Sequence, residues 1–252
     1  MIRFVGAGPG AADLITLRGR DALASADVII YAGSLVNPEL LQYAKKGCEI
    51  HNSAAMTLEE VMAVMVPAER AGRAVVRLHT GDPSIYGAIR EQMDCLDSEG
   101  IDYEVVPGVS SFLGAAASLK AEFTLPGVSQ TLILTRMEGR TPVPEAESIP
   151  NLAAHGAAMA IFLSTAMLET LSARLKEGGF SGEAPAAIVY KATWPDERIV
   201  RTTVDSLAAS AAEHGIYKTA LVLVGGFLGR GYERSLLYDP SFTHEFRPGG
   251  GT

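Results

Sequence analysis

The sequence predicts an α/β fold of two α/β domains with mainly parallel sheets. Short apolar runs typical of strands alternate with helix-like segments along most of the 252 residues. Such alternation is typical of parallel strands that are buried on both faces. The alternation pauses at Ala121–Ser129 and then resumes. We therefore expect an N-terminal domain over 1–120, a C-terminal domain over 121–238 and a loose, Pro- and Gly-rich tail over 239–252.

The elements of the first half follow from apolar periodicity and capping residues. Thr16 can cap a helix that starts at Leu17, and Thr57 with Glu60 three residues later forms a capping box. The strands expected here are Ile2–Val5, Val28–Tyr31, Ala74–Leu78 and Tyr103–Val106. The helices expected are Leu17–Ser25, Leu58–Glu69, Ile85–Glu99 closed by Gly100, and an Ala-rich helix from Pro107-Gly108 to about Leu119.

The second half shows the same alternation. Gly178-Gly179 is a typical helix end. We expect strands at 131–134, 158–163, 186–190, 198–203 and 219–224, with helices at 165–177 and 204–213. Because ligands of such sheets bind beyond the carboxyl ends of strands, the loops after strands are the places to look for a site.

The composition indicates a cytoplasmic enzyme with no nucleic-acid or membrane partner. Net charge is -8, from 21 basic and 29 acidic residues, and the chain has no Lys/Arg cluster. The apolar runs near 157–163 and 219–228 are shorter than the roughly 20 residues that a membrane helix needs. The first strand follows the initiator Met without a charged leader. Cys48 and Cys95 form no CxxC pair, so we expect neither a disulfide framework nor a protein-bound metal.

A glycine loop follows the first strand. Gly6-Ala7-Gly8-Pro9-Gly10-Ala11 matches the dinucleotide pattern G-x-G-x-x-A. Three features disfavour a nicotinamide cofactor: Pro9 lacks an N–H, the helix starts late, and no acidic residue ends the second strand. Two interpretations remain open, a tight structural turn and a loop that borders a substrate cleft.

A second loop, HTGDPSIYG at 79–87, follows the strand Ala74–Leu78. Gly81 allows backbone to approach a ligand, and Pro83 stiffens the loop. Asp82 can accept from local N–H groups or from a ligand's amine or hydroxyl groups. A ligand-binding loop and an Asp-Pro turn with local capping are equally compatible with these residues.

These loops belong to an ordered set of motifs that resembles the tetrapyrrole methylase family. The motifs are Val5-Gly6-Ala7-Gly8-Pro9-Gly10, Asp27-Val28-Ile29-Ile30-Tyr31, Gly81-Asp82-Pro83-Ser84-Ile85-Tyr86-Gly87 and Val106-Pro107-Gly108-Val109-Ser110-Ser111. The resemblance covers nearly the whole chain. It implies S-adenosylmethionine as methyl donor, S-adenosylhomocysteine as product, and two α/β domains with the active-site cleft between them.

Within this family, three further segments resemble the precorrin-4 C-11 methyltransferases of vitamin B12 synthesis. They are Gln130–Pro142, Tyr31–Val36 and Tyr190–Glu197. The resemblance implies methylation of a precorrin ring carbon, with or without cobalt in the ring, by a homodimer. Methylation of rRNA, methylation of a translation-factor histidine, and a binding module that holds the methyl donor without turnover remain as alternatives.

The resemblance also implies the site residues. Ser164 departs from a Met of some relatives, which leaves only a main-chain contact there. For the acidic substrate, Arg136, Arg140 and Lys191 are candidate partners of its carboxylates. The residues implied for the methyl donor are Pro9, Thr80, Gly81, Asp82, Ile85, Tyr86, Ser110, Ser111, Ser164 and Ala192.

A general base is left unassigned. Uroporphyrinogen methylases of the family carry an Asp after the second strand, where this chain has Ala32-Gly33-Ser34. His51 and His79 are the weak candidates, and a structural role is the alternative for each.

Overall fold

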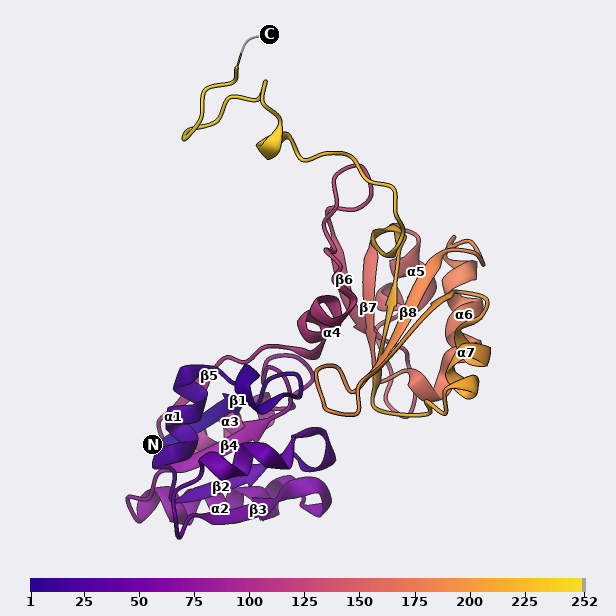
Figure 1. The fold of residues 1–252 in the computed structure, drawn as a ribbon. Helices are drawn as coiled ribbons and strands as arrows, with labels where there is room; N and C mark the ends of the chain where they lie inside the picture. The colour runs from indigo at the N-terminus through magenta and orange to yellow at the C-terminus, as the bar shows by residue number, and fades with distance from the viewer. Residues whose placement is uncertain (251–252) are drawn as a thin grey trace. The chain divides into compact units, whose positions relative to one another are not determined.

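The computed structural model describes residues 1–250, which fold into two compact units (Figure 1). The first unit comprises Met1–Ala115 together with Lys191–Glu197. The second comprises Ala116–Tyr190 and the chain from Arg198 onward. The segment Lys191–Glu197 thus belongs to the first unit, although strands of the second unit flank it in sequence. Among the described residues, no helix has both the length and the apolar character needed to cross a membrane.

The first unit is a parallel five-stranded sheet covered by helices on both faces. Its strand order is β3-β2-β4-β1-β5, and every pairing is parallel. The strands are β1 (Ile2–Gly6), β2 (Val28–Tyr31), β3 (Glu49–Asn52), β4 (Val75–His79) and β5 (Tyr103–Val106). The helices are α1 (Leu17–Ser25), α2 (Leu58–Arg70), α3 (Arg90–Ser98) and α4 (Ser111–Leu119), the last of which continues into the second unit.

Alternating strand residues build the two cores of this unit. On one face Val5 packs with Leu23 of α1. On the other, Phe4 packs with Met65 of α2 and Leu96 of α3. Both helix caps predicted from sequence are confirmed, since Thr16 caps α1 and the Thr57–Glu60 capping box starts α2.

The second unit is also α/β, but its sheet is mixed. The order is β6-β7-β10-β8-β9, and only β6 and β7 are parallel. The expectation of mainly parallel strands therefore holds for the first sheet and is wrong for the second. A buried strand such as the one that contains Val222 and Val224 is apolar on both faces, whether its neighbours are parallel or antiparallel. Hydrophobic periodicity therefore does not show the direction of a strand relative to its neighbours. The strands are β6 (Leu132–Arg136), β7 (Ala158–Phe162), β8 (Pro185–Tyr190), β9 (Arg198–Thr203) and β10 (Ala220–Val224).

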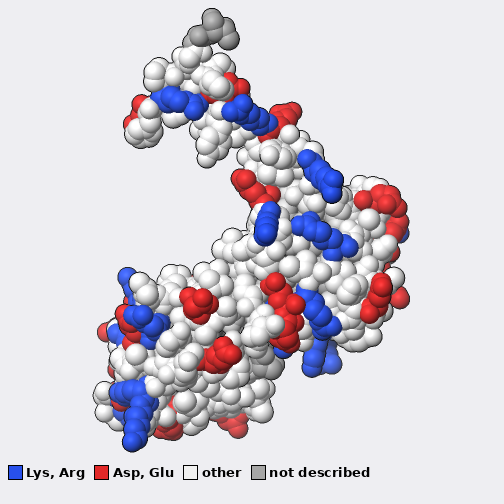
Figure 2. All heavy atoms as spheres, viewed as in Figure 1, with Lys and Arg blue, Asp and Glu red and all other residues white. Residues whose placement is uncertain are grey.

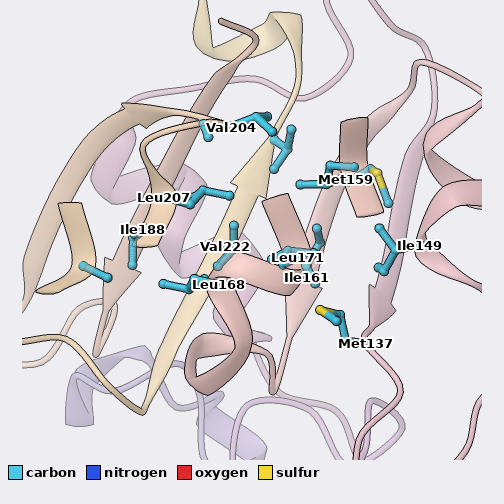
Figure 3. Close-up of a cluster of buried hydrophobic side chains, with 14 of the residues drawn as sticks. Met137, Ile149, Met159, Ile161, Leu168, Leu171, Ile188, Val204, Leu207 and Val222 are labelled. Atoms are coloured by element: carbon cyan, nitrogen blue, oxygen red, sulfur yellow. The ribbon is translucent and has the colours of Figure 1, made fainter. Parts of the chain in front are cut away.

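Three helices cover one face of this second sheet (Figure 1). They are α5 (Ile149–Ala153), α6 (Leu168–Glu177) and α7 (Leu207–Glu213). Figure 3 shows the core between them and the strands, where Leu171 of α6 and Leu207 of α7 meet Ile161 and Val222. Short 3-10 segments join the larger elements: Ala12–Leu14, Gly33–Leu35, Pro38–Tyr43, Ser53–Ala55, Glu145–Glu147, Thr165–Met167, Gly226–Leu228 and Leu236–Tyr238.

Other differences from the sequence-based elements are local. The helix expected over Ile85–Glu99 begins only at Arg90, because Tyr86 and Ala88 have left-handed backbone with φ of 56° and 49°. The edge strand β3 and the short helix α5 were not anticipated. In the tail, Arg247 donates to the carbonyls of Leu237 and Asp239 at 3.0 and 2.7 Å. Residues 251–252 of the expected loose tail lie outside the described residues.

Candidate functional site

Three loops meet at the carboxyl edge of the first sheet, after the neighbouring strands β4, β1 and β5. Glycine lies at each meeting point. A Cβ on Gly108 would lie 2.2 Å from the carbonyl oxygen of Gly81 and 2.7 Å from Cα of Gly6. Such distances are far below van der Waals contact and involve only backbone. The three loops can therefore approach this closely only because these positions lack side chains.

Backbone hydrogen bonds hold the first two loops together. Gly8 N–H donates to Gly81 O at 3.2 Å, and Gly81 N–H donates to Gly8 O at 3.0 Å. Both glycines have positive φ, 80° and 61°. Ala7 N–H extends the pairing by donating to His79 O at 2.7 Å. The glycine loop is thus an extension of the β1–β4 pairing. Helix α1 begins only at Leu17, which agrees with the prediction that disfavoured a dinucleotide site.

Asp82 ties the third loop to the second. Its Oδ2 accepts from Gly108 N–H at 2.8 Å, and its Oδ1 accepts from Ser84 N–H at 2.9 Å and from the Ser84 hydroxyl. Burial raises the pKa of Asp82, but these three hydrogen bonds outweigh burial and leave the pKa below its usual value. The carboxylate is therefore ionised at neutral pH and braces the loops.

The segment Lys191–Glu197 packs against the glycine loop within the first unit. Thr193 Oγ1 accepts from Ala11 N–H at 3.0 Å. A Cβ on Gly10 would lie 2.1 Å from Cδ1 of Trp194 and 2.6 Å from Ala192 O. Thr193 and Trp194 lie in a segment that carries the family resemblance, but no role could be assigned to them from sequence, because the contact between Thr193 and Ala11 spans 182 residues.

Left-handed backbone is concentrated in these segments. Among residues 1–250, seven residues other than glycine have positive φ. Each such residue costs about 1–2 kcal/mol, and clusters of them are typical of functional sites. Four of the seven lie on or directly beside residues expected to bind the methyl donor, and a fifth, Ala88, lies two residues after Tyr86. The four are Tyr86, Leu163, Lys191 and Thr193.

The residues expected to bind the methyl donor belong to the first unit, except Ser164. Pro9, Gly81, Asp82, Ser110 and Ala192 are brought to the same sheet edge by the contacts above and by two more. A Cβ on Gly81 would lie 3.4 Å from Cα of Ser110, and one on Gly114 would lie 2.7 Å from Cβ of Pro9. The others lie in the same loops: Thr80 and Ile85 are half-buried, Tyr86 is exposed and Ser111 starts α4.

In the second unit, Ser164 is fully buried after β7. Its hydroxyl donates to Phe162 O at 2.7 Å and accepts from Met137 N–H at 3.0 Å. The side chain thus joins the ends of β6 and β7. The preceding residue, Leu163, has φ 54° and is 63% exposed. Strained backbone of this kind is more common at functional sites than elsewhere.

The three cations expected to meet substrate carboxylates differ in their surroundings. Arg136 donates to the carbonyl oxygens of Met137, Thr141 and Pro142 at 3.1, 3.2 and 2.8 Å, so it closes the loop that carries Arg140. Arg140 itself is exposed.

Lys191 lies in the first unit. Its Nζ pairs with Asp196 at 2.7 Å and lies 5.0 Å from the centroid of the Trp194 ring.

Both candidate bases have structural partners or deep burial. His51 Nε2 lies 2.7 Å from Glu49 Oε1 on the edge strand β3. His79 is 3% exposed and packs on Phe4, and its Nε2 has no hydrogen-bond partner within residues 1–250. Burial, with the nearby Arg77 charge, lowers the pKa of His79 to about 3. A group this acidic is a weak proton acceptor, which favours a packing role for His79.

Comparison with known families decides the affiliation of the chain. The family model described as Tetrapyrrole (Corrin/Porphyrin) Methylases matches residues 1–208. The chain belongs to this family. This tetrapyrrole methylase is 57% identical over 245 residues to a protein of Methanocaldococcus jannaschii named cobalt-precorrin-4 C(11)-methyltransferase, covering 97% of this chain and 95% of the relative. It is 45% identical over 251 residues to a Sinorhizobium protein named precorrin-4 C(11)-methyltransferase, covering 99% of each.

Solved structures agree with this affiliation. The methylase resembles the X-ray structure of a cobalt precorrin-4 methyltransferase, a cobalamin biosynthetic enzyme, with a TM-score of 0.89, 48% identity, and coverage of 91% of this chain and 96% of that one. It also resembles a uroporphyrin-III C-methyl transferase from Thermus thermophilus complexed with S-adenyl homocysteine. That match has a TM-score of 0.76, 25% identity, and coverage of 90% and 92%.

Proposed function

We propose that this methylase transfers a methyl group from S-adenosylmethionine to C-11 of a precorrin-4 ring in cobalamin biosynthesis. The observation that carries the proposal is near full-length identity of 43–57% to proteins named precorrin-4 or cobalt-precorrin-4 C(11)-methyltransferase. Fragmentary similarity could reflect the fold alone, but these alignments cover at least 94% of the chain.

The local chemistry fits a methyl donor bound through main chain. The expected residues lie mostly at the carboxyl edge of a parallel sheet, where such ligands bind. Two of their polar side chains are occupied by neighbouring groups: Asp82 accepts from Gly108 and Ser84, and Ser164 joins two strand ends. At these positions the loops offer a ligand mainly their backbone, and its strained conformations are typical of functional sites. The Thermus thermophilus neighbour with S-adenyl homocysteine supports the same class of ligand.

The chemistry requires little of the protein beyond orientation. S-adenosylmethionine brings a methyl group already activated by a positive sulfur. The loops after β1, β4 and β5 would fix one reactant, and alignment of this kind can lower a barrier by about 7–11 kcal/mol. Glycine contacts and the Asp82 brace make these loops rigid, which is what alignment needs. His51 pairs with Glu49, and burial lowers the pKa of His79, so the base stays unassigned.

Arg140 is our candidate for a substrate carboxylate. It is exposed in a loop that Arg136 holds closed, so it can offer two parallel N–H groups to a carboxylate. We predict that Arg140→Ala raises the KM for the tetrapyrrole about tenfold and changes the Kd for S-adenosylhomocysteine less than twofold. Arg140→Lys should recover part of the loss, and Arg230→Ala, another exposed arginine of the second unit, is the matched control. Loss of S-adenosylhomocysteine binding with an unchanged tetrapyrrole KM would contradict this role.

The other classes of substrate have less support. On the face drawn in Figure 2, acidic and basic side chains are interspersed, without the continuous basic surface that RNA binding favours. The net charge of -8 agrees. We further propose that the enzyme is cytoplasmic and works as a homodimer, in line with the resemblance to its family. Size-exclusion chromatography with light scattering tests the second point.

Product analysis tests the function. Purified protein should be incubated with S-adenosylmethionine and with metal-free or cobalt-bearing precorrin-4, and the product analysed by mass spectrometry and NMR. We expect one added methyl group at C-11, formed with one equivalent of S-adenosylhomocysteine. The faster of the two substrates identifies the natural ring. Methylation of neither ring, with S-adenosylhomocysteine still bound in calorimetry, would indicate a different acceptor, and absence of binding would overturn the proposal.

A further inference from the structure

A buried arginine is linked by hydrogen bonds to the loop that carries Ile85 and Tyr86. Arg77 is on the central strand β4 and only 7% exposed. No carboxylate forms an ion pair with it among residues 1–250. Burial lowers its pKa to about 10, so it keeps its charge at neutral pH. A buried cation without a counter-ion is unfavourable, and an apolar side chain would fill the space at lower cost.

The guanidinium organises a chain of hydrogen bonds that leads out of the core. Arg77 Nε donates to Gln92 Oε1 at 3.1 Å, and Nη1 donates to Ile30 O at 3.2 Å. Gln92 lies on α3 and is 5% exposed. Because its oxygen is taken by Arg77, its amide nitrogen is oriented the other way and donates to Ala88 O at 3.0 Å. The arginine therefore fixes which end of the Gln92 amide faces the loop.

The end point of this chain is strained backbone. Ala88 has φ 49°, and Tyr86, two residues earlier, has φ 56°. Between them, a Cβ on Gly87 would lie 2.2 Å from Pro83 O, so the segment is folded tightly on itself. Left-handed alanine and tyrosine persist only where surrounding contacts impose them. Asp82 holds one end of the segment, and Gln92 holds the other.

We propose that Arg77 and Gln92 are positioning residues, which hold Ile85–Ala88 in the conformation that binds the methyl donor. The inference rests on the proposed function, because it concerns the affinity for that compound. Neither side chain is expected to touch a ligand. They act through Ala88 O, and loss of their hydrogen bonds lets the strained segment relax.

Gln92→Glu separates positioning from stability. The carboxylate keeps an acceptor for Arg77 and gives the buried cation a counter-ion, but it has no N–H to donate to Ala88 O. We expect a melting temperature equal to or above that of the wild type, with a Kd for S-adenosylhomocysteine roughly five- to tenfold higher, the factor that corresponds to one hydrogen bond. The KM for the methyl donor should rise by the same factor, while the KM for the tetrapyrrole stays unchanged. Gln42→Glu, an exposed change of the same kind in the first unit, should alter none of these values.

Arg77→Met provides the second arm. It removes the charge and lets the Gln92 amide rotate, so the Kd for S-adenosylhomocysteine should also rise at least fivefold, provided that the variant folds. Hydrogen exchange of the Tyr86–Ile89 amides in the ligand-free protein should be faster in both variants. If wild-type protein binds S-adenosylhomocysteine and Gln92→Glu binds it equally well, positioning is disproved and the proposed function stands. If the wild type does not bind it, the proposed function itself fails.

Discussion

Gly108→Ala tests whether close backbone contact among the three loops is what builds the site. The new Cβ would lie 2.2 Å from Gly81 O and 2.7 Å from Cα of Gly6, whereas ordinary contact begins near 3.4 Å. The obstructing atoms are backbone, so no change of rotamer can relieve the overlap. One loop must instead move by about 1 Å. Overpacking of this kind costs about 1–3 kcal/mol of unfolding free energy.

The same shift should affect catalysis more than stability. A displacement of about 1 Å at a site that works by alignment can reduce the rate about 10²-fold. We therefore expect kcat/KM to fall about 10²-fold and the Kd for S-adenosylhomocysteine to rise at least tenfold. The melting temperature should fall by roughly 2–4 °C for each kcal/mol lost. Calorimetry, steady-state kinetics and thermal unfolding measure the three effects.

Two alanine variants serve as controls for Gly108→Ala. Gly72 has φ 73° and open space around it, so Gly72→Ala should cost about 1–2 kcal/mol from backbone strain and leave S-adenosylhomocysteine binding intact. A Cβ on Gly231 would meet nothing within 4 Å, so Gly231→Ala should change neither property. Our reasoning is refuted if Gly108→Ala binds S-adenosylhomocysteine as the wild type does, or if Gly72→Ala loses binding to the same extent.

Two further predictions concern a buried histidine and a half-buried threonine. The pKa of His79 is about 3 in the folded protein and about 6.5 in the unfolded chain. As the pH drops, the unfolded chain therefore binds a proton first, and the protein loses stability between about pH 6.5 and pH 3. Between pH 7 and pH 5 the free energy of unfolding should fall by about 2 kcal/mol from this cause. Urea unfolding at both pH values should show that His79→Gln lacks this part of the pH dependence. An equal pH dependence in both proteins would contradict the assigned burial of His79. Thr193→Val leaves Ala11 N–H without its acceptor, so we expect a loss of about 1–3 kcal/mol with weaker S-adenosylhomocysteine binding, whereas Thr202→Val, which removes a contact of the second unit, should affect stability alone.

Features encoded by neighbouring residues were predictable from the sequence. Thr16 and the pair Thr57 and Glu60 act within one helical turn, and both caps are confirmed. The expectation of helix at Ile85 was wrong, because nothing local shows that Tyr86 and Ala88 adopt positive φ. Gln92 helps to hold that conformation through Ala88 O, and the orientation of its amide depends on Arg77, fifteen residues away on another element.

Strand direction and distant contacts were beyond sequence reasoning. The strands β8 and β10 are buried on both faces, so they read like parallel strands although they are antiparallel. Thr193 and Ala11 lie far apart in sequence, and only the folded chain brings the segment Lys191–Glu197 into the first unit. The family motifs single out the loops that meet at this edge of the first sheet, and the role of these loops in binding stays a prediction. They did not indicate that the polar side chains within them serve mainly to hold backbone.

Because polar side chains hold the backbone in place, a site of this kind can be rich in glycine and poor in free polar groups. The side-chain oxygens of Asp82, Thr193 and Ser164 each accept a hydrogen bond from a main-chain N–H group. We therefore expect the carbonyl and N–H groups of the loops to face the ligand, and their positions depend on close loop packing. Tyr86→Leu, which changes an exposed side chain, should thus be tolerated better than Gly108→Ala. This should hold although Tyr86→Leu alters more atoms than the single methyl group added at Gly108. Comparing Tyr86→Leu with Gly108→Ala in one calorimetric experiment would decide whether backbone position or side-chain identity governs the affinity.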